Sequence, residues 1–217
     1  MKRLISSLLL LITFIVALTS CDVKYDEAEV KAAAKELIEE SILLNDIYWG
    51  EGLPHSEDKN TSDGVYYTAI ESYHYSLGFK NIAELKALTE KTFSKGFCQT
   101  QIYPTILESV QDGDKAIILS RYYQKYGGKN FNEPESIMVN STWKKIINSE
   151  VEYDYESIAV KGSDEERVYV TLNATVKKDG YDPQTREIEI ALVEEDDGWK
   201  IDSPTYLNYY HSENDKK

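Results

Sequence analysis

The sequence is poor in cysteine, with only two in 217 residues, and one of them stands at the end of an apolar leader. Cys21 and Cys98 therefore leave no pair for a disulfide inside a folded domain. Histidines are equally few, and His55, His74 and His211 lie far apart, without the paired spacing of a metal site. We expect Cys98 to be a small buried apolar residue, and we expect no metal and no cofactor.

Glycine and proline are also scarce, with 11 and 5 residues, and acidic side chains outnumber basic ones by 38 to 24. With 41% apolar and 29% charged residues, the composition is that of a globular protein and not of a long disordered chain. The formal net charge of −14 repels phosphate backbones, so nucleic acid is not an expected partner. Two interpretations of the acidic surface remain open: it binds a basic partner, or it only keeps the protein in solution.

One long apolar run stands at the start of the chain, over residues 4–18. Lys2 and Arg3 precede it, which completes the positive start and apolar core of an export signal over residues 1–20. The run is shorter than the roughly 20 residues needed to span a bilayer. We therefore expect a signal peptide and not a transmembrane helix.

The sequence Leu18-Thr19-Ser20-Cys21 resembles the lipobox of bacterial lipoproteins. This resemblance implies that Cys21 becomes the mature N-terminus and carries a thioether-linked diacylglycerol, often with an amide-linked acyl chain. Two or more acyl chains anchor a protein stably where one chain is marginal, so we expect the protein at the extracytoplasmic face of the cell membrane. The expected organisation is a signal peptide (1–20), a lipidated tether (21–25), a single domain (26–212) and a polar tail (213–217).

The first half of the domain is predicted to be helical. Asp26 is placed as an N-cap, with Glu29 at the capping-box position, and Gly50 and Gly52 end the helix. Its residues at helical spacing form one predominantly apolar face that needs a sheet to lie on. This face consists of Val30, Ala34, Leu37, Ile38, Ser41, Leu44, Asn45 and Tyr48.

A second helix is predicted to begin at Asn81, with Glu84 at the capping-box position, and to end at Lys95-Gly96. Its apolar stripe is Ile82, Leu85, Leu88 and Phe93. A third helix is expected over residues 101–109. Residues 65–75 fit either a strand or a helix, and we favour a short strand or an irregular segment.

The second half of the domain has the period of strands. We expect strands over residues 117–126, 129–131, 139–147, 153–161, 167–176, 186–193 and 197–202. In the strand over 167–176, Val168, Val170 and Leu172 share one face, while Tyr169 and Thr171 share the other. Such alternation indicates one buried and one wetter face. Helices followed by an antiparallel meander predict an α+β fold, with the helices packed on a curved sheet.

This order, ending in the stretch from Asp197 to Tyr206 with a Trp just after a tight turn, resembles the nuclear-transport-factor-2-like (cystatin-like) superfamily. The resemblance implies a cone-like sheet over about residues 26–210. More narrowly, the chain looks like the small lipoproteins of low-GC Gram-positive bacteria that carry this domain and have no assigned function. A weaker likeness, in Leu85 to Ser94, is to secreted inhibitors of cell-wall DL-endopeptidases.

Enzymes of this superfamily use Asp, His and Tyr inside the cone, where the apolar wall shifts the pKa of a buried carboxylate or imidazole so that it can act as a general base. Here His74 stands between Tyr73 and Tyr75, and Asp154 stands between two further tyrosines. No motif places them in one pocket, and neither a glycine-rich phosphate loop nor a Gly-x-Ser-x-Gly elbow occurs. We therefore do not expect an enzyme.

Tyrosine is abundant, with 17 residues against 5 phenylalanines. Tyrosines suit binding surfaces, but they also fill half-buried positions in sheets. The candidate binding residues are Tyr66, Tyr73, His74, Tyr122 and Tyr169. We expect a membrane-anchored, non-enzymatic domain that binds a small ligand or an envelope protein. The alternatives are an inhibitor of a cell-wall hydrolase and a pocket enzyme of the isomerase or hydratase type.

Overall fold

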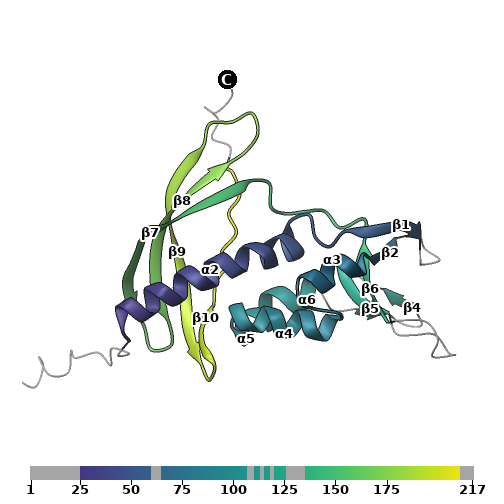
Figure 1. Cartoon of the computed structure of the whole chain (residues 1–217), viewed down its shortest axis with the longest axis horizontal. Helices are drawn as coiled ribbons and strands as arrows, with labels where there is room; N and C mark the ends of the chain where they lie inside the picture. Colours follow the sequence, from purple (N-terminus) through teal and green to yellow (C-terminus); the bar gives the residue numbers. More distant parts are fainter. Residues whose placement is uncertain are drawn as a thin grey trace, which may run out of the picture.

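The computed structural model describes residues 25–59, 65–106, 110–112, 115–117, 120–125 and 135–210. Within these ranges the chain is an α+β protein with two four-stranded antiparallel sheets and a two-stranded hairpin (Figure 1). The strand orders are β1-β2-β6-β5, β10-β9-β8-β7 and β3-β4. The expectation of helices combined with antiparallel sheet is therefore confirmed.

The helical elements are α2 (Glu27–Trp49), α3 (Glu71–Ser76), α4 (Ile82–Thr92), α5 (Lys95–Phe97), the π-helical turn η1 (Cys98–Ile102) and α6 (Tyr103–Ile106). The short strands are β1 (His55–Lys59), β2 (Tyr66–Ala69), β3 (Val110–Asp112), β4 (Lys115–Ile117), β5 (Tyr122–Lys125), β6 (Ser136–Asn140) and β10 (Gly198–Ile201). The long strands are β7 (Glu150–Ser163), β8 (Val168–Lys177) and β9 (Gln184–Glu195).

Helix α2 begins as predicted and lies across the β7–β10 sheet (Figure 1). Asp26 Oδ1 accepts hydrogen bonds from the backbone N–H of Ala28 at 2.8 Å and of Glu29 at 3.4 Å. Every residue of the predicted inner face is buried. The amphipathic pattern was therefore sufficient to assign both the helix and the side that it turns to the sheet.

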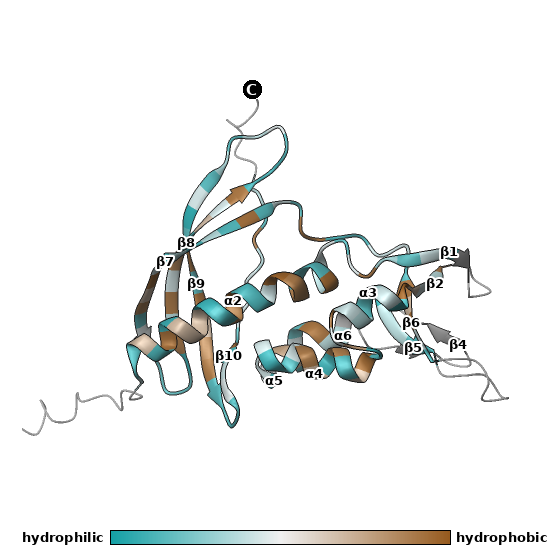
Figure 2. Ribbon diagram, viewed as in Figure 1, coloured by the Kyte–Doolittle hydropathy of each residue, from teal (hydrophilic) through white to brown (hydrophobic). Residues whose placement is uncertain are grey.

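The β7–β10 sheet also has the predicted faces. Val168, Val170 and Leu172 are at most 1% exposed, whereas Asn173 on the other face is exposed. Thr171, which was predicted for the same wetter face, is an exception, because it is buried at 8% exposure. Figure 2 shows hydrophobic and hydrophilic residues alternating along these strands. The buried face of β8 packs into the same apolar core as α2 and α4.

Helix α4 starts as predicted but ends earlier. Asn81 Oδ1 accepts the N–H of Glu84 at 2.8 Å, and Glu84 in turn accepts the N–H of Lys80 at 2.7 Å. The helix stops at Thr92 because Ser94 N-caps the next helical segment, its hydroxyl accepting the N–H of Phe97 at 2.9 Å. Lys95 and Gly96 thus begin α5 and do not end α4, and the expected third helix starts six residues before position 101.

The expectation of one continuous curved sheet is not met. Strand β5 pairs with β6, and β6 pairs with β2, so these strands form a separate sheet with β1. The strand expected over 139–147 ends at Asn140, whose Oδ1 accepts the N–H of Thr142 at 2.9 Å and turns the chain. The return strand expected over 129–131 lies outside the described residues.

Candidate functional site

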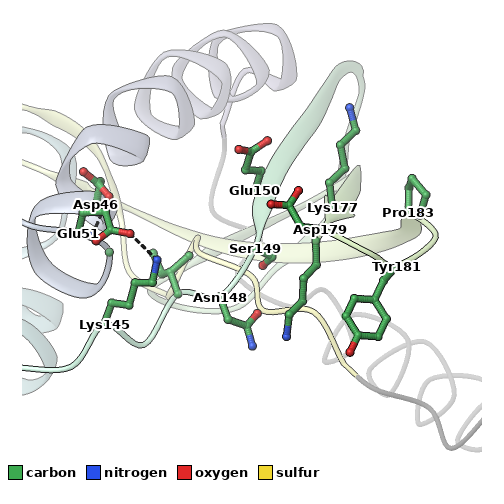
Figure 3. A pocket seen from close by; sticks show the side chains of 13 residues that line it. Asp46, Glu51, Lys145, Asn148, Ser149, Glu150, Lys177, Asp179, Tyr181 and Pro183 are labelled. Atoms are coloured by element: carbon green, nitrogen blue, oxygen red, sulfur yellow. Dashed lines mark hydrogen bonds and ion pairs between the residues drawn. The ribbon is translucent and has the colours of Figure 1, made fainter. Parts of the chain in front are cut away.

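A cleft of about 560 Å³ opens where the end of α2 meets the loop before β7 and the turn between β8 and β9 (Figure 3). We call it the charged cleft. Its lining residues are Asp46, Gly50, Glu51, Lys145, Ile147, Asn148, Ser149, Glu150, Lys177, Lys178, Asp179, Tyr181 and Pro183. They come from three segments that are far apart in the sequence, so the cleft exists only in the folded chain.

The end of α2 holds one wall of the cleft. The N–H of Gly50 donates to the carbonyl oxygens of Asn45 and Asp46 at 3.1 and 3.0 Å, which closes the helix. The loop before β7 is then fastened to this end, because the N–H groups of Ile146 and Ile147 both donate to the Trp49 carbonyl, at 2.8 and 3.0 Å. The free carbonyls of a helix C-terminus thus position the loop.

The C-terminal segment supports the loop from the other side. The N–H of Asn148 donates to Asn208 Oδ1 at 3.0 Å, and the N–H of Tyr209 donates to Asn148 Oδ1 at 3.0 Å. Tyr209 is buried and packs against Tyr181 of the β8–β9 turn, with the ring centroids 5.2 Å apart and the rings tilted by 42°. These reciprocal contacts link the loop, the turn and the C-terminal segment around the cleft.

The charges of the cleft are unevenly paired. Lys145 makes an ion pair with Glu51, drawn as a dashed line in Figure 3, and this contact raises the pKa of Lys145. Lys177 pairs with Glu152, outside the cleft. Three lining carboxylates have no ion-pair partner among the described residues: Asp46, Glu150 and Asp179.

A second hollow of about 360 Å³ continues from the charged cleft and shares Asp46, Ile147, Ser149 and Glu150 with it. We call it the apolar groove, because its remaining walls are largely hydrophobic. These walls are Ile42, Asn45, Val151, Tyr153, Tyr206 and Leu207. Together the two hollows form one elongated site along the last two turns of α2.

A chain of buried hydroxyl and amide groups lies beneath the groove. Asn45 Nδ2 donates to Thr205 Oγ1, Thr205 Oγ1 donates to Ser41 Oγ, and both distances are 2.8 Å. Ser41 Oγ completes the chain by donating to the Ile38 carbonyl at 2.8 Å. Ser41, Asn45 and Thr205 are each at most 4% exposed. The C-terminal segment is thereby fixed to α2 directly under the groove.

Two of the predicted binding tyrosines are core residues of the β1-β2-β6-β5 sheet. Tyr122 is fully buried, and its hydroxyl donates to the Ile47 carbonyl at 2.7 Å while accepting the Leu53 N–H at 3.0 Å. Burial raises the pKa of Tyr122 to about 12. Tyr66 is also buried, and its hydroxyl donates to the Ser120 carbonyl at 2.9 Å. Their hydroxyls are engaged in holding the fold.

The remaining predicted residues lie in two places, with Tyr73 and His74 adjacent in α3 and Tyr169 in β8. His74 in α3 is 2% exposed, with Nδ1 at 3.0 Å from the Phe79 carbonyl, while the neighbouring Tyr73 is 37% exposed. Tyr169 is on the wetter face of β8, where its hydroxyl donates to Asp164 and lowers the pKa of that carboxyl. The structure does not bring these residues together, and none of them lines the charged cleft or the apolar groove.

The other candidates are equally scattered. Asp154 is exposed on β7 beside an irregularity in the pairing with β8. Cys98 is fully buried, as predicted, and burial raises the pKa of its thiol to about 12. Cys21 and His211 lie outside the described residues. No cluster of His, Cys, Asp and Glu suited to a metal ion is found in the part of the chain that the structure describes.

Comparison with family models, curated proteins and solved structures finds no match to this chain. Among the described helices, none is long and apolar enough to cross a membrane. The charged cleft and the apolar groove are therefore the structural features that bear on function.

Sequence reasoning missed this site because its residues come from turns and loops. Lys145 was expected at the end of a strand over 139–147, but that strand stops at Asn140, and Asn148 and Asp179 lie in stretches that match no motif. One feature of the sequence did point to this region. Three tyrosines, Tyr206, Tyr209 and Tyr210, follow the last strand closely, which is unusual for a segment that does not pack on the domain. That density of aromatic rings indicates that the segment packs onto the domain.

Proposed function

We propose that this protein is a lipid-anchored lipoprotein at the extracytoplasmic face of the cell membrane, and that its domain binds a ligand or a protein without catalysing a reaction. The observation that carries the binding role is the elongated site formed by the charged cleft and the apolar groove. Its combined size suits a ligand or a short chain segment. The lipobox ending at Cys21 supports the location.

The arrangement of candidate catalytic groups favours binding over catalysis. His74 lies in α3 and Asp154 on an exposed part of β7, so neither faces the elongated site. A general base has to lie within hydrogen-bonding reach of a bound substrate. A binding function requires only complementary walls, which the site supplies.

The relationship to the nuclear-transport-factor-2-like superfamily is part of the same proposal, and it concerns α2 and the β7–β10 sheet. In favour of it, one long helix lies across four antiparallel strands whose last hairpin carries Trp199 just after the Asp197-Gly198 turn. Trp199 packs against the core and its indole N–H donates to Glu29 of α2 at 3.3 Å. The β1-β2-β6-β5 sheet would then be an addition to that unit.

The anchor is tested by Cys21→Ala. Because the acyl chains have no other attachment site, we expect this variant to lose metabolic labelling with an alkyne-bearing fatty acid and to leave the membrane fraction. Cys98→Ala is the matched control, since Cys98 is buried in the domain, and it should remain labelled and bound to membranes. Continued labelling of Cys21→Ala would contradict the anchor.

The binding role is tested by placing a photo-crosslinking amino acid at Asp179, an exposed lining residue of the charged cleft. After irradiation of intact cells we expect a discrete crosslinked product. Glu187 on β9 is the control position, because it is exposed but lines neither hollow. Identical products from both positions, or none from Asp179, would refute a binding role for this site.

A further inference from the structure

The β7–β10 sheet has two edges, and the edge at β10 is covered by the chain itself. Phe93 forms an isolated parallel bridge with Ile201 of β10, and the N–H of Ser94 donates to the Ile201 carbonyl at 2.8 Å. These contacts occupy backbone groups that would otherwise pair with another strand. The end of β10 is therefore closed to a strand from another molecule.

The opposite edge, at β7, is covered by no described strand. In the order β10-β9-β8-β7, β7 is the outermost strand and pairs only with β8 among the described residues (Figure 1). Its pairing is irregular between Asp154 and Ala159 and again between Val160 and Gly162. Such bulges bend a strand and interrupt its ladder. The regular part of this edge is therefore Glu150–Asp154, which we call the open edge.

An open edge presents backbone N–H and C=O groups that can pair with another strand, and a second copy of the same chain supplies an identical strand. Two copies can pair edge to edge about a two-fold axis perpendicular to the sheet, which makes the two strands antiparallel. This axis keeps the same face of both sheets on the same side, so each side chain meets one from the corresponding face of the second copy. The residues on each face therefore decide whether copies pair.

The outer face of the open edge is acidic. Glu150, Glu152 and Asp154 alternate with Val151 and Tyr153, and the acidic residues are exposed whereas the other two are half-buried. Tyr153 packs against the core, which assigns the alternate row to the inner face. In a pair of copies centred on Tyr153, Glu152 of one copy would lie opposite Asp154 of the other. Like charges directly opposite each other in a sheet are destabilising.

The open edge keeps an excess of negative charge within the folded chain. Glu152 makes an ion pair with Lys177 of β8, whereas Glu150 and Asp154 make none among the described residues. Lys177 lies opposite Glu150 in the strand register, so one cation is shared by three carboxylates. The repulsion between two such edges is therefore only partly relieved.

We infer that the carboxylates of the open edge keep copies of this protein from pairing edge to edge, and that the same backbone pairs with a strand of opposite charge. The unpaired backbone groups and the half-buried Val151 and Tyr153 favour pairing, and the facing carboxylates oppose it. Reversing the charge on one copy replaces repulsion by attraction and leaves the backbone unchanged. The inference concerns the assembly of the domain and does not depend on the elongated site.

The test mixes the unaltered full-length chain with the variant Glu152→Lys/Asp154→Lys, both in dodecyl maltoside and carrying donor and acceptor dyes at the C-terminus. We expect energy transfer in the mixture, with a Kd about tenfold lower than for either chain alone, because only the mixture places lysines opposite carboxylates. Added salt should weaken this pairing, because exposed charges are screened. The amides of residues 150–154 should exchange hydrogen more slowly in the mixture, which locates the contact.

Glu187→Lys/Glu189→Lys is the matched control. Both residues are exposed on the outer face of β9, two positions apart, and Glu189 makes an ion pair with a lysine as Glu152 does. Because β9 is paired on both sides, by β8 and β10, it offers no open edge. A mixture of this variant with the unaltered chain should show no more energy transfer than the unaltered chain alone.

The inference is overturned if the mixture with the β7 variant shows no more transfer than its components while both chains have the same far-ultraviolet circular dichroism. Equal pairing in the β9 mixture would also overturn it. If the β7 lysine variant does not fold, Glu152→Gln/Asp154→Asn decides, and it should self-associate about threefold more tightly than Glu187→Gln/Glu189→Gln. Equal self-association of these two variants would show that the carboxylates of the open edge do not keep copies apart.

Discussion

Replacing Arg121 with methionine is expected to lower the free energy of unfolding by about 3–5 kcal/mol. Arg121 is 3% exposed, and its guanidinium donates to the carbonyl oxygens of Tyr48 at 2.7 Å and of Gly50 at 2.9 Å. It therefore caps the C-terminus of α2 with a positive charge, at the end where the helix dipole is negative. Methionine keeps much of the aliphatic stem but leaves two buried carbonyls without their donors.

The measurement is urea-induced unfolding followed by circular dichroism, with the slope of the transition compared between variants. Lys161→Met is the control, because Lys161 is exposed and pairs with Glu189 on the surface, where ion pairs contribute little. An unfolding midpoint for Arg121→Met equal to that of Lys161→Met would show that the capping contact is not needed for stability.

The second large effect is expected at the centre of β8. Leu172→Ala should cost about 2–5 kcal/mol, because Leu172 is 1% exposed and its truncation leaves a cavity in the core shared by the sheet and α2. Asn173→Ala, one residue along the same strand and on the exposed face, should change stability by no more than about 0.5 kcal/mol. The same unfolding experiment measures both.

The pair of variants also tests the assignment of faces, because successive side chains of a strand point to opposite sides of the sheet. Equal losses of stability at the two positions would mean that β8 is buried on both faces or that its register differs. A large loss for Leu172→Ala alone would support the single buried face that the alternation predicts.

Local patterns were enough to predict α2, α4 and the β8–β10 meander. The start of α2 depends on Asp26 and on the spacing of its own apolar residues, and the alternation in β8 is contained in ten residues. Each of these signals is complete within one element, so no knowledge of distant contacts was needed. The structure confirms these predictions except for the end of α4, which lies at Thr92.

The second sheet could not be predicted because its pairing is between distant segments. Strand β2 pairs with β6, which lies about 70 residues later in the sequence. The strand expected over 117–126 is not a single strand, because Ile117 ends β4 and Tyr122–Lys125 form β5 in another sheet. The alternation in this stretch could not predict either sheet, because it says nothing about the pairing partner. What places β5 is the contact of Arg121 and Tyr122 with the end of α2, and that is a tertiary interaction.

The elongated site was unpredictable for the same reason. Its floor joins Asn45 to Thr205 across 160 positions of the chain, and its rim depends on the contact between Asn148 and Asn208. Polar residues in loops carry no periodic signal, so a sequence offers no direct way to see that they meet. The predicted tyrosines were conspicuous by composition, but Tyr66 and Tyr122 turned out to be core residues.

Gly50 belongs to two structures at once, and this couples them mechanically. It lines the charged cleft, and its carbonyl accepts the hydrogen bond of Arg121 from the edge of the β1-β2-β6-β5 sheet. The adjacent Trp49 carbonyl also accepts the hydrogen bonds of the loop before β7. The last turn of α2 is therefore the shared attachment point of the sheet and of the cleft wall. A force applied to the β1-β2-β6-β5 sheet would therefore reach the cleft directly.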